Sequence, residues 1–141
     1  MTAVRAGDEI PSYEVGPVSP EKMRTMSALM SDANPVHFDA AAVRRLGLGD
    51  RVINQGPLNQ AYVVSMLAEW AGGADRVRSV RLRYRGNVFA GDQLRASGAV
   101  SDVVDQDGVV LANCEVHLDV IGRGAVLSGT ATVLLGPSGG R

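Results

Sequence analysis

The sequence predicts an α+β domain in which a curved antiparallel sheet wraps around one long central helix. Between residues 61 and 71 nearly every side chain is apolar, and only Ser65 and Glu69 interrupt the run, which is typical of a helix buried on almost all sides. The chain after this helix contains four segments in which apolar and polar residues alternate as they do in half-buried strands. A helix of this kind needs a cover, and these strands can supply it.

Length and composition favour one globular domain. The chain has 141 residues, of which 45% are hydrophobic and 21% charged, so we expect a single domain over residues 1–135. Residues 136–141 contain little that can pack, and we expect a disordered tail there. A net charge of −1 argues against binding to nucleic acid or to an anionic membrane. Without a signal peptide or a membrane span, and with Cys114 as its one cysteine, the protein is expected to be cytoplasmic and free of disulfides.

Two short helices are expected before the central one. Residues 7–15 read as an edge strand, and Ser19 then has the position of an N-cap, followed by proline and an acidic residue at the start of a helix that ends near Met30. Asp39 is expected to cap a second short helix over residues 40–46, which Gly47 would end.

The central helix is expected to begin at Pro57 and to end at the Gly72-Gly73 pair. Four strands follow it in the prediction, around residues 80–85, 94–104, 109–121 and 125–135. Residues 106–108 and 122–124 carry hairpin signals that would join the last three strands. Because a sheet of this kind leaves edges that must be covered or paired, we expect a dimer.

Residues 31–39 form the stretch in which chemistry is expected. Asp32 and His37 stand five positions apart, and Pro35 fixes the backbone between them and pushes Asn34 out of the helical region. The result is a rigid loop that can hold a carboxylate and an imidazole at one spot. The alternative is an ordinary turn that ends the preceding helix, with His37 at the surface.

Three stretches resemble one family. The pattern Asp32-x-Asn34-Pro35-x-His37-x-Asp39 is similar to the signature of the MaoC-like (R)-specific enoyl-CoA hydratases and dehydratases, which have the hot-dog fold. Residues 52–56 resemble the family's entry into its central helix, and residues 81–92 resemble its strand and turn after that helix. The resemblance extends over residues 19–133 and implies a hot-dog fold for this chain.

This chain also departs from the family's pattern. The family often has glycine where this chain has Ser31, histidine where it has Gln55, and methionine or leucine where it has Pro57. Residues 53–72 are also similar to small actinobacterial hydratase subunits that act on steroid side-chain CoA thioesters and pair with a second, different hot-dog chain.

The resemblance implies that Asp32 and His37 act as an acid–base pair on one water and convert a 2-enoyl-CoA to a (3R)-hydroxyacyl-CoA, or carry out the reverse dehydration. Asn34 would orient the pair or the water. A helix N-terminus has free N–H groups and a positive dipole end, so the amide of Gly56 is the expected donor to the thioester oxygen, in preference to the side chain of Gln55. No metal-ligand cluster or cofactor motif is present, and coenzyme A enters as part of the substrate.

Several alternatives remain open at this point. The same fold supports acyl-CoA thioesterases, and a non-catalytic acyl-binding subunit of a heteromeric hydratase is a further alternative. An acyl carrier protein could present the acyl group in place of coenzyme A. The partner is a second copy or a second hot-dog chain. Arg81, Arg83 and Arg85 could bind the phosphates of coenzyme A or simply cover a solvated sheet face.

Overall fold

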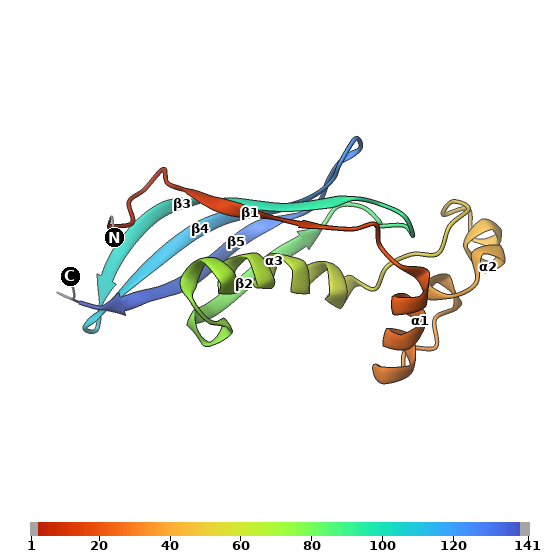
Figure 1. Cartoon of the computed structure of the whole chain (residues 1–141), viewed down its shortest axis with the longest axis horizontal. Coiled ribbons are helices and arrows are strands. Elements are labelled where there is room, and N and C mark those ends of the chain that lie inside the picture. The colour runs from red at the N-terminus through yellow and green to blue at the C-terminus, as the bar shows by residue number, and fades with distance from the viewer. Residues whose placement is uncertain (1–2, 139–141) are drawn as a thin grey trace.

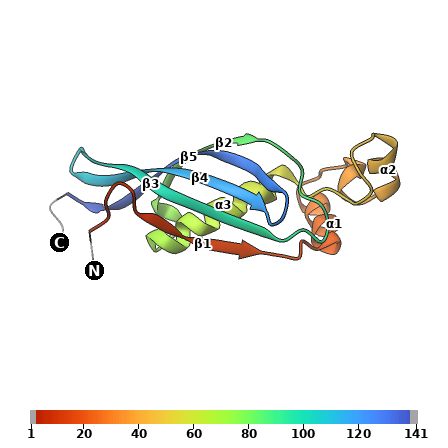
Figure 2. The same ribbon diagram turned by 90° about the horizontal axis from the view of Figure 1, so that it is seen from above.

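A computed structural model describes residues 3–138 of the chain. It contains one antiparallel five-stranded sheet in the order β1-β3-β4-β5-β2, with a long helix, α3, packed along one face (Figures 1 and 2). The elements in chain order are β1 (Glu9–Val15), α1 (Pro20–Leu29), η1 (Pro35–His37), α2 (Ala40–Arg45), α3 (Gly56–Ala71), η2 (Ala74–Arg76), β2 (Val77–Tyr84), β3 (Leu94–Gln106), β4 (Val109–Val120) and β5 (Gly124–Pro137).

The predicted α+β architecture, a curved sheet wrapped on a central helix, is confirmed. The four strands after the helix are present, and β1 joins them at the edge beside β3. The prediction for the tail was partly wrong, because β5 continues through Gly136 and Pro137 and pairs there with the start of β4. Ser138, also in that predicted tail, donates a 2.8 Å hydrogen bond from its amide to the carbonyl of Gly108, and residues 139–141 lie outside the described residues.

Local signals in the sequence account for the helix ends and for one hairpin. The hydroxyl of Ser19 accepts a hydrogen bond from the amide of Lys22, so this residue caps α1 as predicted. Asp39 caps α2 in the same way. Between β3 and β4 the two turn residues, Asp107 and Gly108, have φ angles of 53° and 80°, which is the type of tight turn that matches the twist of a hairpin.

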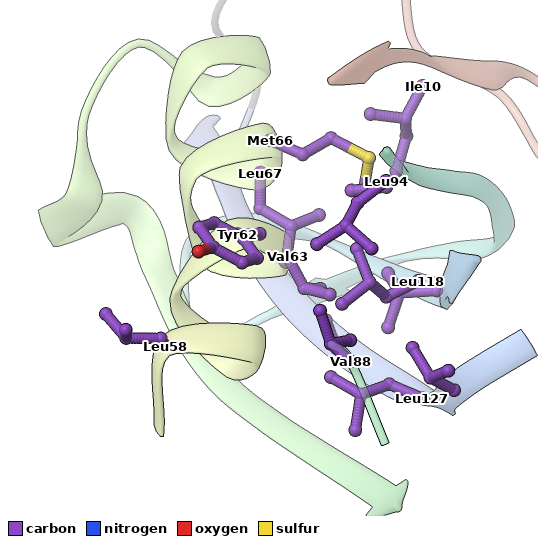
Figure 3. Close-up of a cluster of buried hydrophobic side chains, with 14 of the residues drawn as sticks. Ile10, Leu58, Tyr62, Val63, Met66, Leu67, Val88, Leu94, Leu118 and Leu127 are labelled. Carbon is purple, nitrogen blue, oxygen red and sulfur yellow. The ribbon is translucent and has the colours of Figure 1, made fainter. Parts of the chain in front are cut away.

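The core lies between α3 and the concave face of the sheet. Figure 3 shows Val63, Met66 and Leu67 of the helix directed toward side chains of the strands, and all three are at most 1% exposed. The prediction that α3 is buried on almost all sides was wrong for this chain by itself. Ala61 is exposed, and Val64 and Ala68 are half-buried on the side of the helix that the sheet does not cover. This side offers an apolar surface for a partner.

The segment that contains α1, η1 and α2 projects beyond the end of the sheet, next to the N-terminus of α3 (Figures 1 and 2). The chain then returns through an antiparallel bridge between Ile53 and Phe89, and the amide of Asn54 donates a 2.7 Å hydrogen bond to the carbonyl of Val88. These contacts fix the start of α3 beside the projecting segment. Among the described residues, no helix is long and apolar enough to cross a membrane.

Candidate active site

Asp32 lies three residues after the end of α1 at Leu29. Its amide donates a 2.9 Å hydrogen bond to the carbonyl of Ser27, so the end of the helix holds its backbone in place. Ser31, just before it, has a φ of 52°, in the left-handed region that favours glycine. One carboxylate oxygen of Asp32, Oδ1, accepts a 3.1 Å hydrogen bond from the amide of Asn34. The turn after α1 therefore aims the other oxygen, Oδ2, at a fixed position.

His37 lies opposite that oxygen. Its Nε2 atom is 3.1 Å from Oδ2 of Asp32, and its Nδ1 atom is 2.8 Å from the carbonyl oxygen of Ile53. The histidine side chain is 11% exposed and that of Asp32 is 32% exposed, so solvent or a ligand reaches the pair mainly from the aspartate side. The loop over residues 31–39 brings the two predicted side chains together.

The contacts of His37 define where its protons are. A carbonyl oxygen only accepts hydrogen bonds, so Nδ1 must carry a hydrogen that it donates to Ile53. Nε2 faces a carboxylate at 3.1 Å, and that contact is favourable when one proton lies between the two atoms. This arrangement of a carboxylate and an imidazole in hydrogen-bond contact is of the kind that acid–base chemistry uses.

Asn34 contacts the pair through its backbone and not through its side chain. Its Oδ1 atom accepts a 3.2 Å hydrogen bond from the amide of Val36 and so caps η1, the short helix that ends in His37. Its own amide bonds Asp32. Asn34 therefore holds Asp32 through its amide and holds His37 indirectly, by capping the helix that ends in this histidine.

Gly56 is the first residue of α3, and its amide is available to a ligand. Pro57 has no N–H group, and the amides of Leu58 and Asn59 both donate to the carbonyl of Gln55, at 3.1 and 3.2 Å. Within residues 3–138 the N–H of Gly56 has no such acceptor. It is the donor of this first turn that the helix leaves unused, at the positive end of the helix dipole.

The side-chain amide of Gln55 donates its hydrogen bonds to α1. It is 0% exposed, and its Nε2 atom donates to the carbonyl of Met23 at 2.8 Å and to the hydroxyl of Ser27 at 3.0 Å. Both acceptors belong to α1, so Gln55 ties α1 to the start of α3. The structure therefore brings Gln55 close to the predicted site, with its amide nitrogen bonded to α1.

Sequence reasoning missed a second group of polar residues beside this site. Asn54 donates through Nδ2 to Oδ1 of Asn59 at 2.8 Å and to the hydroxyl of Tyr62 at 3.3 Å, and all three side chains are buried. In Figure 3 the hydroxyl of Tyr62 points away from the hydrophobic cluster. Asn59 and Tyr62 stand at helical spacing from the buried residues Val63 and Met66 of α3, and this spacing was the signal in the sequence that could have placed them on the buried face.

Asp92 anchors the loop that follows β2. Its carboxylate accepts hydrogen bonds from Arg123 at 2.8 Å and from the amide of Phe89 at 2.8 Å, and Arg51 lies 3.3 Å away. Burial opposes the ionised form, but the bonds from Arg123 and Phe89 and the charges of Arg123 and Arg51 outweigh it and hold the pKa of Asp92 below its usual value. This cluster supports the bridge between Ile53, whose carbonyl contacts His37, and Phe89.

The remaining candidates lie away from the pair. Arg81 and Arg83 are exposed on β2, Arg85 is exposed directly after that strand, and His117 is exposed on β4. Burial raises the pKa of the Cys114 thiol to about 11, which leaves it unreactive. In the part of the chain that the structure describes, no three His, Cys, Asp or Glu side chains gather in a way that could hold a metal ion.

Comparisons with known proteins identify the fold and the family of this chain. The solved structures that share the fold include R-hydratase PhaJ1 from Pseudomonas aeruginosa (TM-score 0.79, 21% identity, 95% of this chain and 83% of that chain covered), an (R)-hydratase from A. caviae involved in PHA biosynthesis (0.79, 20%, 94% and 98%), and the ChsH1-ChsH2 complex from Mycobacterium tuberculosis (0.75, 21%, 95% and 98%). The comparison with curated proteins gives no match.

At these identities the structural neighbours establish the fold, which is the hot-dog fold that the resemblance implied. The family follows from the sequence itself. The model of one family, described as the MaoC like domain, matches residues 4–120, a span that includes the Asp32–His37 loop, the central helix and most of the sheet. This chain therefore belongs to the MaoC-like domain family, a family of hydratases and dehydratases.

Proposed function

We propose that this protein is an (R)-specific enoyl-CoA hydratase, or the corresponding dehydratase, with Asp32 and His37 as its acid–base pair. The observation that carries the proposal is the 3.1 Å contact between Oδ2 of Asp32 and Nε2 of His37, with Nδ1 of His37 bonded to Ile53. Membership of the MaoC-like family supports the same reaction class. The geometry is also suited to the chemistry, because both directions of the reaction need one proton accepted and one proton donated at neighbouring positions.

In the hydration direction, a water molecule bound at the pair gives one proton to it while the water oxygen bonds to C3 of the enoyl thioester. The pair returns one proton to C2, so the enzyme ends in the protonation state in which it began. The hydrogen bond from Nδ1 of His37 to Ile53 fixes the ring, and the amide of Asn34 fixes Asp32. No metal or redox cofactor takes part in the proposed reaction.

Negative charge develops on the thioester oxygen when C3 is attacked. The N–H of Gly56 is our proposed donor to this oxygen, because it is unused by the helix and lies at the positive end of the α3 dipole. Gly56 is half-buried and has no side chain to obstruct the approach of a carbonyl group. Gln55, by contrast, contributes by holding α1 against this first turn.

A partner chain is part of the proposal. The uncovered side of α3 bears apolar residues, and large hydrophobic side chains of the projecting segment are exposed around the acid–base loop: Leu29 (74%), Met30 (37%), Phe38 (42%), Leu46 (62%) and Leu48 (43%). Surfaces of this kind are typical of interfaces. The partner is either a second copy or a second hot-dog chain, and one structural neighbour, ChsH1-ChsH2, is a complex of two chains.

The test is the loss of ultraviolet absorbance of a 2-enoyl-CoA when purified protein is added. Short-chain, long-chain and steroid side-chain substrates should be compared, with detection of free thiol in parallel and chiral analysis of the product. Loss of absorbance without free thiol and formation of the (3R)-alcohol are expected. Release of thiol would instead identify a thioesterase. If no substrate reacts even when the protein is combined with its co-purified partner, the proposed function is wrong and an acyl-binding subunit is the remaining alternative.

A further inference from the structure

Tyr84, the last residue of β2, lies against the first turn of α3. Its hydroxyl donates a 3.0 Å hydrogen bond to the carbonyl of Gly56 and lies 3.5 Å from Oε1 of Gln60. The side chain is 50% exposed, although residues of the same strand at the same spacing, Val80 and Leu82, pack on the core. An exposed aromatic ring at this place is not accounted for by core packing.

The ring of Tyr84 explains why residue 56 is a glycine. Gly56 is helical and does not have a positive φ, so its backbone conformation does not require glycine. A Cβ atom at this position would lie 3.3 Å from Cε1 and from the hydroxyl oxygen of Tyr84, which is closer than most Cβ contacts in proteins. The absence of a side chain therefore lets the ring rest directly on the backbone of Gly56.

Hydrogen bonds hold Gly56 on both of its sides. The peptide group before it is fixed because the carbonyl of Gln55 accepts from Leu58 and Asn59. The peptide group after it belongs to the first turn of α3, and its carbonyl also accepts from Tyr84. The N–H of Gly56 lies in the plane of the first peptide group, and the bond from Tyr84 to the second limits rotation about the backbone of Gly56 that would tilt this N–H before a ligand arrives.

We propose that Tyr84 is a positioning residue that holds the N–H of Gly56 in the orientation needed to receive the thioester oxygen. This inference rests on the proposed hydratase function and adds a residue to it that neither the Asp32–His37 motif nor the helix start reveals. A donor that is already oriented stabilises developing charge without reorganising during the reaction. Loss of the restraint should therefore affect the chemical step more than substrate binding.

The first test is Tyr84→Phe, which keeps the ring and removes the hydroxyl, with Tyr13→Phe on β1, at the opposite edge of the sheet, as its matched control. From the usual strength of one hydrogen bond we expect kcat to fall about 3- to 10-fold in Tyr84→Phe with KM unchanged, while the thermal midpoint changes little because Tyr84 is half-exposed. Tyr13→Phe should leave all three unchanged. A wild-type kcat in Tyr84→Phe overturns the inference, and so does a loss of kcat that is matched by a loss of stability.

The second test uses the contact between the ring and Gly56. Gly56→Ala should lose most activity while Tyr84 is present, because the new methyl group meets the ring. Gly56→Ala/Tyr84→Ala should be more active than Gly56→Ala, because the contact with the ring is gone, but less active than Tyr84→Ala, because the methyl group still crowds the approach of the thioester carbonyl. Gly56→Ala/Tyr84→Phe, which keeps the ring, should not recover activity. A Gly56→Ala/Tyr84→Ala variant no more active than Gly56→Ala contradicts the proposal.

A third measurement does not depend on turnover. The ¹⁵N relaxation of Gly56 should report greater backbone motion in Tyr84→Phe than in wild type or in Tyr13→Phe. Unchanged motion overturns the positioning role even if the substrates tested for the proposed function are all inert. If the backbone motion of Gly56 increases in Tyr84→Phe but no substrate reacts, the result counts against the hydratase assignment alone. The failure of one proposal can therefore be told from the failure of the other.

Discussion

Nε2 of Gln55 donates a 2.8 Å hydrogen bond to the carbonyl oxygen of Met23, and this contact joins the two helices on which the candidate site depends. Helix α1 ends at Leu29, six residues after Met23 and just before the loop that carries Asp32, and Gln55 directly precedes Gly56. This buried amide therefore helps to set the separation between the acid–base pair and the proposed oxyanion donor, together with the contact of His37 with Ile53. The same nitrogen also bonds the hydroxyl of Ser27, so a single side chain spans both acceptors.

Gln55→Leu should lower the free energy of unfolding by about 1–2 kcal/mol, because it leaves the hydroxyl of Ser27 buried without its partner. It should also lower hydration activity, since the two halves of the site are no longer tied together. Urea unfolding and the absorbance assay check both effects. Gln106→Leu, at the exposed end of β3, is the matched control and should change neither. If Gln55→Leu and Gln106→Leu have the same stability and the same hydration activity, the hydrogen bonds from Gln55 to α1 are not needed.

Asp32→Asn and His37→Ala should each lower enoyl-CoA hydration by about 100-fold or more, because each removes one member of the pair that exchanges a proton with water. Stability should be nearly unchanged for Asp32→Asn, since the side chain is partly exposed and asparagine still accepts the bond from the amide of Asn34. Steady-state kinetics and thermal unfolding are the measurements.

The matched control for these variants is Asp39→Asn, two residues beyond His37. Asparagine caps a helix about as well as aspartate, so the cap of α2 is preserved and both activity and stability should stay at wild-type levels. Near wild-type rates in both Asp32→Asn and His37→Ala would mean that the reaction takes place elsewhere in the molecule.

Features encoded by neighbouring residues were predictable from the sequence. The caps at Ser19 and Asp39 and the turn at Asp107-Gly108 depend on a few adjacent positions, and each is present as predicted. The approach of Asp32 to His37 belongs to the same class, because a short loop stiffened by Pro35 joins them.

Contacts between distant segments were not predictable in this way. Tyr84 forms a hydrogen bond with Gly56, 28 positions away in the sequence, and Gln55 forms one with Met23, 32 positions away. A pattern of neighbouring residues does not predict such contacts. The uncovered side of α3 was missed for a related reason. An apolar run shows that a helix will be covered, but it does not show whether its own chain or a partner supplies the cover.

Ser31→Gly should stabilise the protein by up to about 1 kcal/mol, because Ser31 has a φ of 52° and a residue with a Cβ is strained in that region. The family often has glycine at this position. Ala28→Gly, in the exposed face of the preceding helix, is the comparison and should destabilise by a similar amount. Thermal unfolding of the two variants should therefore shift in opposite directions, and a shift in the same direction would contradict the strain at Ser31.

Asp92→Asn should destabilise the protein by about 2 kcal/mol or more at pH 7, because the buried carboxylate loses its charge-assisted bonds from Arg123 and Arg51. The pKa of Asp92 is lower in the folded than in the unfolded state, so its contribution is complete above the unfolded value of about 4 and is lost as the pH falls through the folded value. Urea unfolding should therefore show a difference in the free energy of unfolding between wild type and Asp92→Asn that is smaller at pH 3 than at pH 7. Asp50→Asn, at an exposed position, is the control and should have the stability of wild type at both pH values. If the difference in stability between wild type and Asp92→Asn is the same at both pH values, the ionisation of Asp92 does not stabilise the loop.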